Sequence, residues 1–164
     1  MKTAGKSPYP YSEATAAFMD MAGQDRPRQR LLPLDGTGYQ PSPGDKGTLL
    51  GLQNAINQVV SRVHHPVLRL RLALLLEEVQ ELSDACLHEN MELIARNVAD
   101  VLYVAHSFPH GLGYDGDAVY DCVHQANLSK RRGKVRSDGK QLAPPGFQPP
   151  DVLRALRENP AKRD

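Results

Sequence analysis

The sequence has no tryptophan and few other aromatic residues, with three phenylalanines and six tyrosines among 164 residues. A core built on Leu, Val and Ala favours helices over a β-sandwich. Long apolar runs are also missing, since the longest, Leu72 to Leu76, is far too short to span a bilayer. Residues 1–11 lack the apolar segment of a secretory signal. We therefore expect a protein without a membrane span that resides in the cytoplasm.

An excess of charge of either sign is absent as well. Lys and Arg total 20 against 19 Asp and Glu, which leaves a net charge of +1. This balance argues against a partner that is a nucleic acid polymer, because such proteins are strongly basic. It still allows a small phosphate-bearing ligand, which needs only a few cations and metal ions.

Cysteine is scarce too, with only Cys86 and Cys122. Both fall on apolar faces of predicted helices. We interpret them as small core residues and not as a disulfide framework.

Apolar spacing and the positions of Pro and Gly predict an all-α chain of one domain. The expected helices cover residues 12–22, 49–63, 67–87, 91–108 and 115–130, with a short helical turn at 151–157. Pro109 and Gly111 are expected to end the fourth of these helices. The predicted division is a flexible N-terminus at 1–11, a helical domain at 12–152 with a loop at 23–47, and a C-terminal tail at 153–164. Within the basic, Pro- and Gly-rich segment after Arg131, Asp138-Gly139 predicts a turn.

The helix expected at 67–87 carries two stripes of side chains at helical spacing. The first is apolar throughout and predicts core: Leu68, Leu72, Leu75, Val79, Leu82 and Cys86. The second places two carboxylates where more leucine is expected: Val67, Leu70, Leu74, Glu78, Glu81 and Ala85. Glu77 precedes both, so three acidic groups share an arc of about 100°. One short neighbour cannot cover both stripes, so we expect at least a homodimer.

The following helix repeats the pattern. Its face consists of Leu93, Asn97, Asp100, Val104 and Phe108, so a polar pair at i, i+3 again interrupts an apolar stripe. Antiparallel packing through the short connection at Glu89-Asn90 would bring the polar groups of the two helices opposite one another.

Two interpretations of these carboxylates stay open. Like charges at i, i+4 destabilise a helix by roughly a few tenths of a kcal/mol, and burial increases that cost. A divalent cation would compensate, and oxygen ligands favour Mg²⁺ or Mn²⁺ over Zn²⁺. The alternative is a solvated acidic face on a helical interaction module, which is how most EExxE runs occur.

Four segments, in this order, resemble a known family. They are Glu77-Glu78-Val79-Gln80-Glu81, Ala99-Asp100-Val101-Leu102-Tyr103, residues 113–130, and Asp138-Gly139-Lys140 followed by Pro145-Gly146-Phe147. The first two resemble the EExxE…ExxD signature of all-α nucleotide pyrophosphohydrolases, the group of MazG, the dimeric dUTPases and phosphoribosyl-ATP pyrophosphohydrolase. The last is similar to the tail of MazG-like proteins that hydrolyse dUTP, the Deinococcus type in particular.

The resemblance implies a four-helix MazG-like bundle in an intertwined homodimer, sometimes paired into a tetramer. It also implies that Mg²⁺ or Mn²⁺ supports hydrolysis of a nucleoside triphosphate, with dUTP the first candidate, to the monophosphate and pyrophosphate. By the same resemblance Glu78, Glu81, Asp100 and Asn97 are metal ligands, and Glu77 is a further ligand or the base that takes a proton from water.

The resemblance further implies substrate contacts. Asn127 and Lys130 are expected to contact phosphate, although a surface helix end is an equally good interpretation of this pair without the family. Arg131 and Lys140 belong to a basic set that can close over the phosphates or form a solvated loop. Tyr103 is expected in the core, with contact to the sugar or base as the alternative.

One position departs from the family pattern. Asn97 stands where the family has the glutamate of ExxD. An amide oxygen can ligate Mg²⁺, but it cannot offset the charge of the ion. A second hypothesis is therefore a catalytically weakened protein that binds nucleotide as a sensor.

Overall fold

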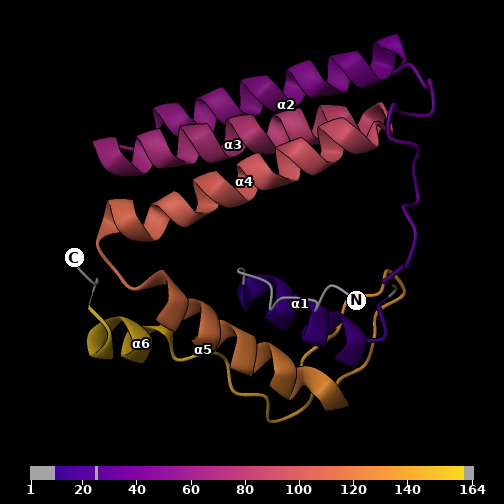
Figure 1. The fold of residues 1–164 in the computed structure, drawn as a ribbon. Coiled ribbons are helices and arrows are strands. Elements are labelled where there is room, and N and C mark those ends of the chain that lie inside the picture. The colour runs from indigo at the N-terminus through magenta and orange to yellow at the C-terminus, as the bar shows by residue number, and fades with distance from the viewer. Residues whose placement is uncertain (1–9, 25, 161–164) are drawn as a thin grey trace, which may run out of the picture. The chain divides into compact units, whose positions relative to one another are not determined.

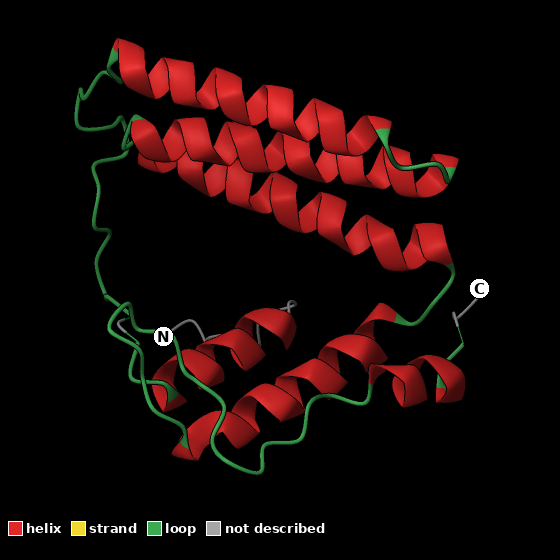
Figure 2. Ribbon diagram, turned by 180° about the vertical axis from the view of Figure 1, so that it is seen from behind, coloured by secondary structure: helices red, strands yellow, loops and turns green. Residues whose placement is uncertain are grey.

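The computed structural model of the chain describes residues 10–24 and 26–160. Most of the N-terminus expected to be flexible, and the last four residues of the expected C-terminal tail, lie outside the described residues. The all-α prediction is confirmed: the described chain folds into helices and loops and has no strand, although Val135 and Gln141 form an isolated bridge (Figure 2). The helices are α1 (Pro10–Met21), α2 (Pro43–Ser61), α3 (Pro66–Leu87), α4 (Met91–Leu112), α5 (Gly116–Leu128), the 3₁₀ turn η1 (Ser129–Arg132) and α6 (Val152–Glu158).

The chain divides into two compact units. One is Gln29–Tyr114 with α2, α3 and α4, and the other joins Met1–Arg28 to Asp115–Asp164 with α1, α5 and α6. In the first unit α3 lies beside both α2 and α4 (Figure 1). A turn of three residues connects α3 to α4, so these two helices are antiparallel, as expected. Within that turn Glu89 adopts a positive φ of 49°, and Asn90 caps α4 by accepting a hydrogen bond from the Leu93 amide at 3.1 Å.

Helix α2 begins six residues before the expected start, so the loop predicted at 23–47 is wrong at its C-terminal end. The reason is a capping box. Ser42 accepts a hydrogen bond from the Asp45 amide at 3.2 Å, and the Asp45 carboxylate accepts one from the Ser42 amide at 2.8 Å. Pro43 occupies the first turn, where its missing N–H is not needed. Local capping therefore outweighs the two glycines that suggested a loop, Gly44 and Gly47.

Helix α4 continues through Pro109 and Gly111 to Leu112, so the predicted stop at these residues is wrong. A proline inside a helix removes one backbone hydrogen bond and strains the preceding turn. Near the helix end this loss is limited. The better stop is Gly113, which adopts the left-handed conformation at φ 76° and donates its amide to the Pro109 carbonyl at 2.8 Å.

In the second unit, α5 packs against both α1 and α6. The contact with α1 centres on Tyr120, whose hydroxyl donates to the Tyr11 carbonyl at 3.2 Å and lies 3.0 Å from the Thr15 hydroxyl. The rings of Tyr11 and Tyr120 are 4.2 Å apart. Helix α6 occupies 152–158, which agrees with the short helical turn expected there.

The basic segment after η1 forms a small hairpin, which we call the tail hairpin (residues 134–142). Its two sides are joined by the Arg136 amide to the Lys140 carbonyl and by the Leu142 amide to the Lys134 carbonyl, each at 2.8 Å. The turn predicted at Asp138-Gly139 is confirmed, with Gly139 at φ 84°.

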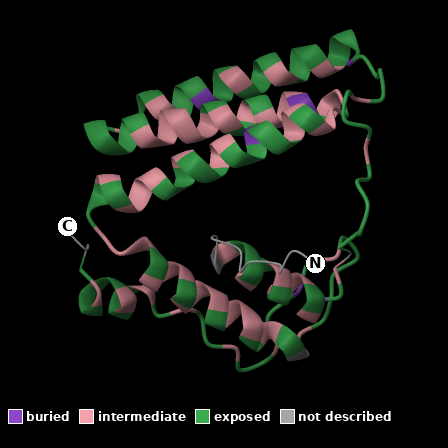
Figure 3. Cartoon of the chain, in the orientation of Figure 1, coloured by how far each residue is buried: buried purple, intermediate pink, exposed green. Residues whose placement is uncertain are grey.

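Burial in the described chain is shallow (Figure 3). The buried apolar residues of the core are Ala22, Ile56 and Ala85. On α3 the stripe predicted as core is only half covered, since Leu68 and Val79 are each 37% exposed. Cys86 is exposed, so its interpretation as a core residue is wrong; Cys122 is half-buried, and both thiols are free. The second stripe provides the buried residue of this helix, Ala85, which is 2% exposed.

None of the helices in residues 10–24 and 26–160 combines the length and the apolar content needed to cross a membrane.

Candidate active site

Three glutamates of α3 form one end of the candidate site. Glu77 and Glu81 are exposed, while Glu78 is half-buried among the apolar residues of its stripe. On the helix, Glu77 and Glu81 lie about 100° and about 60° from Glu78, both to the same side of it, so they stand farther from the covered face.

Neighbouring carboxylates influence the protonation of the Glu78 carboxyl group. The pKa of Glu78 is raised above its ordinary value, first by burial and then by the charges of Glu81, Asp100 and Glu77. Asp100 lies on α4, so the expected approach of acidic groups from the two antiparallel helices is present. The guanidinium of Arg96 lowers the pKa of Glu78, but its effect is smaller than that of burial or of any of the three carboxylates.

Asn97 is the most deeply buried polar residue of this unit, with 3% of its surface exposed. Its Oδ1 accepts a hydrogen bond from Arg96 Nε at 3.2 Å. The α4 face that carries Asn97 is the less exposed side of the helix, since Leu93, Asp100, Val104 and Phe108 are all half-buried. The predicted polar pair within an apolar stripe is therefore present. Arg96 was not recognised from the sequence, because an arginine next to the signature has no spacing that marks it.

The donor chemistry of this region suits a hard cation. Carboxylate and amide oxygens are the ligands that Mg²⁺ and Mn²⁺ take. In the described part of the chain, however, three or more His, Cys, Asp or Glu side chains are nowhere gathered into a metal-holding group. The oxygen donors thus share one region of α3 and α4 without converging on one point, and holding an ion requires their side chains to turn inward.

Tyr103 is 82% exposed, so its placement in the core is wrong. It follows Leu102, which is 54% exposed, on a side of α4 that no other element of its unit covers. Residues one position apart on a helix point about 100° from each other. Leu102 and Tyr103 therefore mark a broad exposed surface of α4.

The predicted phosphate contacts lie in the other unit. Lys130 Nζ donates a hydrogen bond to Asn127 Oδ1 at 2.7 Å and sits 5.4 Å from the centre of the Phe147 ring. The expected pairing of Asn127 with Lys130 is therefore seen. Phe147 belongs to the tail motif Pro145-Gly146-Phe147, but its contact with Lys130 could not be predicted from the sequence because 17 positions separate the two residues.

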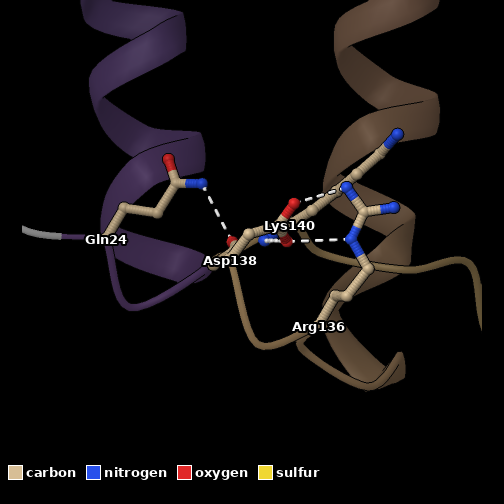
Figure 4. Close-up of polar contacts among 5 residues, drawn as sticks. Gln24, Arg136, Asp138 and Lys140 are labelled. Atoms are coloured by element: carbon tan, nitrogen blue, oxygen red, sulfur yellow. Dashed lines mark hydrogen bonds and ion pairs between the residues drawn. The ribbon is translucent and has the colours of Figure 1, made fainter.

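Arg131 and Lys140 are exposed; the first lies in η1 and the second on the tail hairpin. Figure 4 shows how the hairpin turn is held. Arg136 Nε donates to Asp138 Oδ1 at 2.9 Å, and Gln24 Nε2 donates to the Gly139 carbonyl at 3.3 Å. The Lys140 backbone amide joins this network by donating to Asp138 Oδ1 at 3.2 Å. The guanidinium of Arg136 is thus paired with the Asp138 carboxylate within the turn.

Part of the chain matches a known protein family. Residues 53–127 match the model of phosphoribosyl-ATP pyrophosphohydrolase. The matched segment contains the acidic groups of α3 and α4 and extends through α5 to Asn127. That family belongs to the MazG-like nucleoside triphosphate pyrophosphohydrolase superfamily. The resemblance inferred from the EExxE run and its partner segment is therefore confirmed, and the match supports a nucleotide pyrophosphohydrolase. Comparison with curated proteins gave no match.

Proposed function

We propose that this MazG-like protein hydrolyses a nucleoside triphosphate, with dUTP as the preferred substrate, to the monophosphate and pyrophosphate. The observation that carries the proposal is the crowding of Glu77, Glu78, Glu81 and Asp100 around a half-buried position without enough positive charge to balance them. Such crowding is costly in the absence of a cation. The family match over residues 53–127 supports the same chemistry.

In this proposal Mg²⁺, or Mn²⁺, is held by Glu78, Glu81 and Asp100, with the amide oxygen of Asn97 as a neutral ligand. When bound, such an ion would offset phosphate charge and make water a better nucleophile. Glu77 is a further ligand or accepts the proton of the attacking water. For Asn97 to serve, its Oδ1 must exchange the Arg96 hydrogen bond for the ion.

Positive and polar groups then bind the substrate. Lys130 and Asn127 contact phosphate oxygens, and Arg131 and Lys140 add charge around them. Tyr103, which is solvent-exposed on α4, contacts the sugar or the base.

We further propose that the chain acts as a homodimer, or as a tetramer of two dimers, in the cytoplasm. Large apolar side chains are exposed along α3 and α4, among them Leu70 at 55%, Val98 at 41% and Leu102 at 54%. A monomer seldom leaves so much apolar surface open. Sedimentation velocity tests this part, and a monomer at all concentrations would refute it.

A nucleotide panel tests the activity. Pyrophosphate release is measured from dUTP, dCTP, dTTP, dATP, dGTP and UTP with Mg²⁺ or Mn²⁺, with Glu78→Ala as the control. We expect release from dUTP above the others and loss of release in the control. Release that survives in Glu78→Ala would reject the proposed site.

A second candidate is a nucleotide-binding sensor with little turnover. Asn97 favours it, because it stands at a family glutamate and its oxygen is already hydrogen-bonded to Arg96. The variant Asn97→Glu separates the two candidates: a sharp gain in turnover supports the weakened protein, and no gain supports a site that works with the amide.

A third candidate, also open from the sequence, is a helical interaction module with a solvated acidic face. It predicts that Mg²⁺ and Mn²⁺ leave the thermal melt unchanged, because only a ligand of the native state raises the melting temperature.

A further inference from the structure

Lys130 differs from the other cations of the basic segment in its partners. Its ammonium contacts two uncharged groups, the amide oxygen of Asn127 at 2.7 Å and the ring of Phe147 at 5.4 Å. None of the ion pairs in the described residues includes Lys130, whereas Arg136 is paired with Asp138. Lys130 is also half-buried, while Arg131, Lys134 and Lys140 are exposed. The structure therefore holds one positive charge in place without neutralising it.

The tail is fastened to the end of α5 at the residue that carries this charge. Gln141 is 8% exposed, and its Nε2 donates to the Lys130 carbonyl at 2.9 Å and to the Gly133 carbonyl at 2.8 Å. Gly133 passes so close to the Leu142 carbonyl that a Cβ at this position would overlap it. Two independent contacts thus fix the return of the chain beside Lys130.

Phe147 reaches Lys130 through a second turn. The Phe147 amide donates to the Pro144 carbonyl at 3.1 Å, and Gly146 adopts a φ of 78°, which glycine takes without strain. This turn places the ring over the ammonium. A lysine side chain otherwise samples many rotamers, so the ring restricts where the charge lies.

We propose that Phe147 is a positioning residue for phosphate binding: its ring holds the Lys130 ammonium beside Asn127, so that the remaining N–H groups face a phosphate oxygen. The inference rests on the proposed function for the nature of the ligand. A cation over a ring at a partly exposed site contributes roughly 0.5–1 kcal/mol, which corresponds to an affinity change of about 2- to 5-fold. An aromatic ring serves better than an aliphatic group, because only the ring attracts the cation.

The test is the binding of inorganic pyrophosphate with Mg²⁺, measured by titration calorimetry at low ionic strength. We expect Phe147→Leu to weaken binding about 2- to 5-fold and Phe147→Tyr to restore it. In a Lys130→Met background, Phe147→Leu should have no further effect, because the ring acts through the lysine. Equal losses in both backgrounds, or an unchanged affinity in Phe147→Leu, would overturn the inference.

A second measurement needs no substitution. In the unaltered protein the ε-methylene protons of Lys130 should show an upfield ring-current shift in the NMR spectrum, and pyrophosphate should perturb it. Unshifted protons would also overturn the inference. Turnover enters neither experiment, so a protein that hydrolyses no nucleotide but shows the Phe147 dependence would fail the proposed function and support this inference. Turnover without that dependence would do the reverse.

Discussion

The α2–α4 unit and the unit that contains α5 each hold charge that nearby groups do not balance, but of opposite sign. In the first, Glu78 is surrounded by Glu77, Glu81 and Asp100, and Arg96 offsets them only in part. In the second, Lys130 is held by an amide and a ring. We infer that neither region is arranged for stability alone, because each keeps charge that nearby groups of opposite sign do not fully offset. A metal ion at the first region and a phosphate group at the second are the ligands that we propose for them.

The largest expected effect follows from removing the central carboxylate. Glu78→Ala should lower kcat/KM by about 100-fold or more, because losing the proposed metal ligand would remove charge stabilisation of roughly several kcal/mol. Steady-state kinetics with dUTP and Mg²⁺ measures this. Glu92→Gln, an exposed acid in the first turn of α4, serves as the control and should stay close to the unaltered protein. A similar loss of kcat/KM in both variants would show that Glu78 has no particular role in the reaction.

The role of the positive charge in the unit that contains α5 is tested at Lys130. Lys130→Met should raise KM about 10-fold or more and change kcat less, because a charge-assisted hydrogen bond contributes about 1.5–3 kcal/mol. The matched variant is Arg154→Met, which removes a cation that is paired with Glu158 at 2.8 Å in α6. We expect little change in its KM. An equal rise of KM in the two variants would show that the KM depends on the total charge of the protein and not on the position of the Lys130 ammonium.

The two units should also respond differently to alanine in place of glycine. Gly133→Ala should destabilise the fold by about 1–3 kcal/mol, because the added Cβ overlaps the Leu142 backbone. Gly51→Ala, in the middle of α2 with open space around it, should stabilise by about 0.5–1 kcal/mol. Denaturant unfolding measures both. Opposite signs are the prediction, and a loss of stability in both variants would contradict it.

The smallest effect concerns pH. A raised carboxyl pKa means that the folded state favours the neutral form of Glu78. Its contribution to stability is thus present below the ordinary value of 4.5 and is lost as pH rises through the raised pKa. In the metal-free protein Glu78→Gln should remove this loss and raise the melting temperature near pH 7 by about 1 °C. Mg²⁺ should stabilise the unaltered protein and not the variant, whereas an equal response would argue against a metal at Glu78.

Much of this arrangement is readable from the sequence, and the parts that are not have physical reasons. The helical period places Glu78 and Asp100 toward neighbouring helices, and a three-residue turn leaves little freedom in how α3 and α4 meet. The start of α2 was misplaced because the Ser42 and Asp45 capping box outweighs its glycines. The contact of Lys130 with Phe147 could not be predicted from the sequence for another reason. The ring of Phe147 arrives through two turns and a hairpin, and nothing local in the sequence specifies such a long return.

The measurement that tests the account most directly is the ³¹P NMR spectrum of dUTP incubated with the protein and Mg²⁺. We expect signals of the nucleoside monophosphate and pyrophosphate in equal amounts, no product signals with Glu78→Ala, and much slower growth of the product signals with Lys130→Met. Formation of the diphosphate and orthophosphate would contradict the assigned bond. An unchanged dUTP spectrum from the folded, metal-supplied protein would contradict the enzymatic role itself.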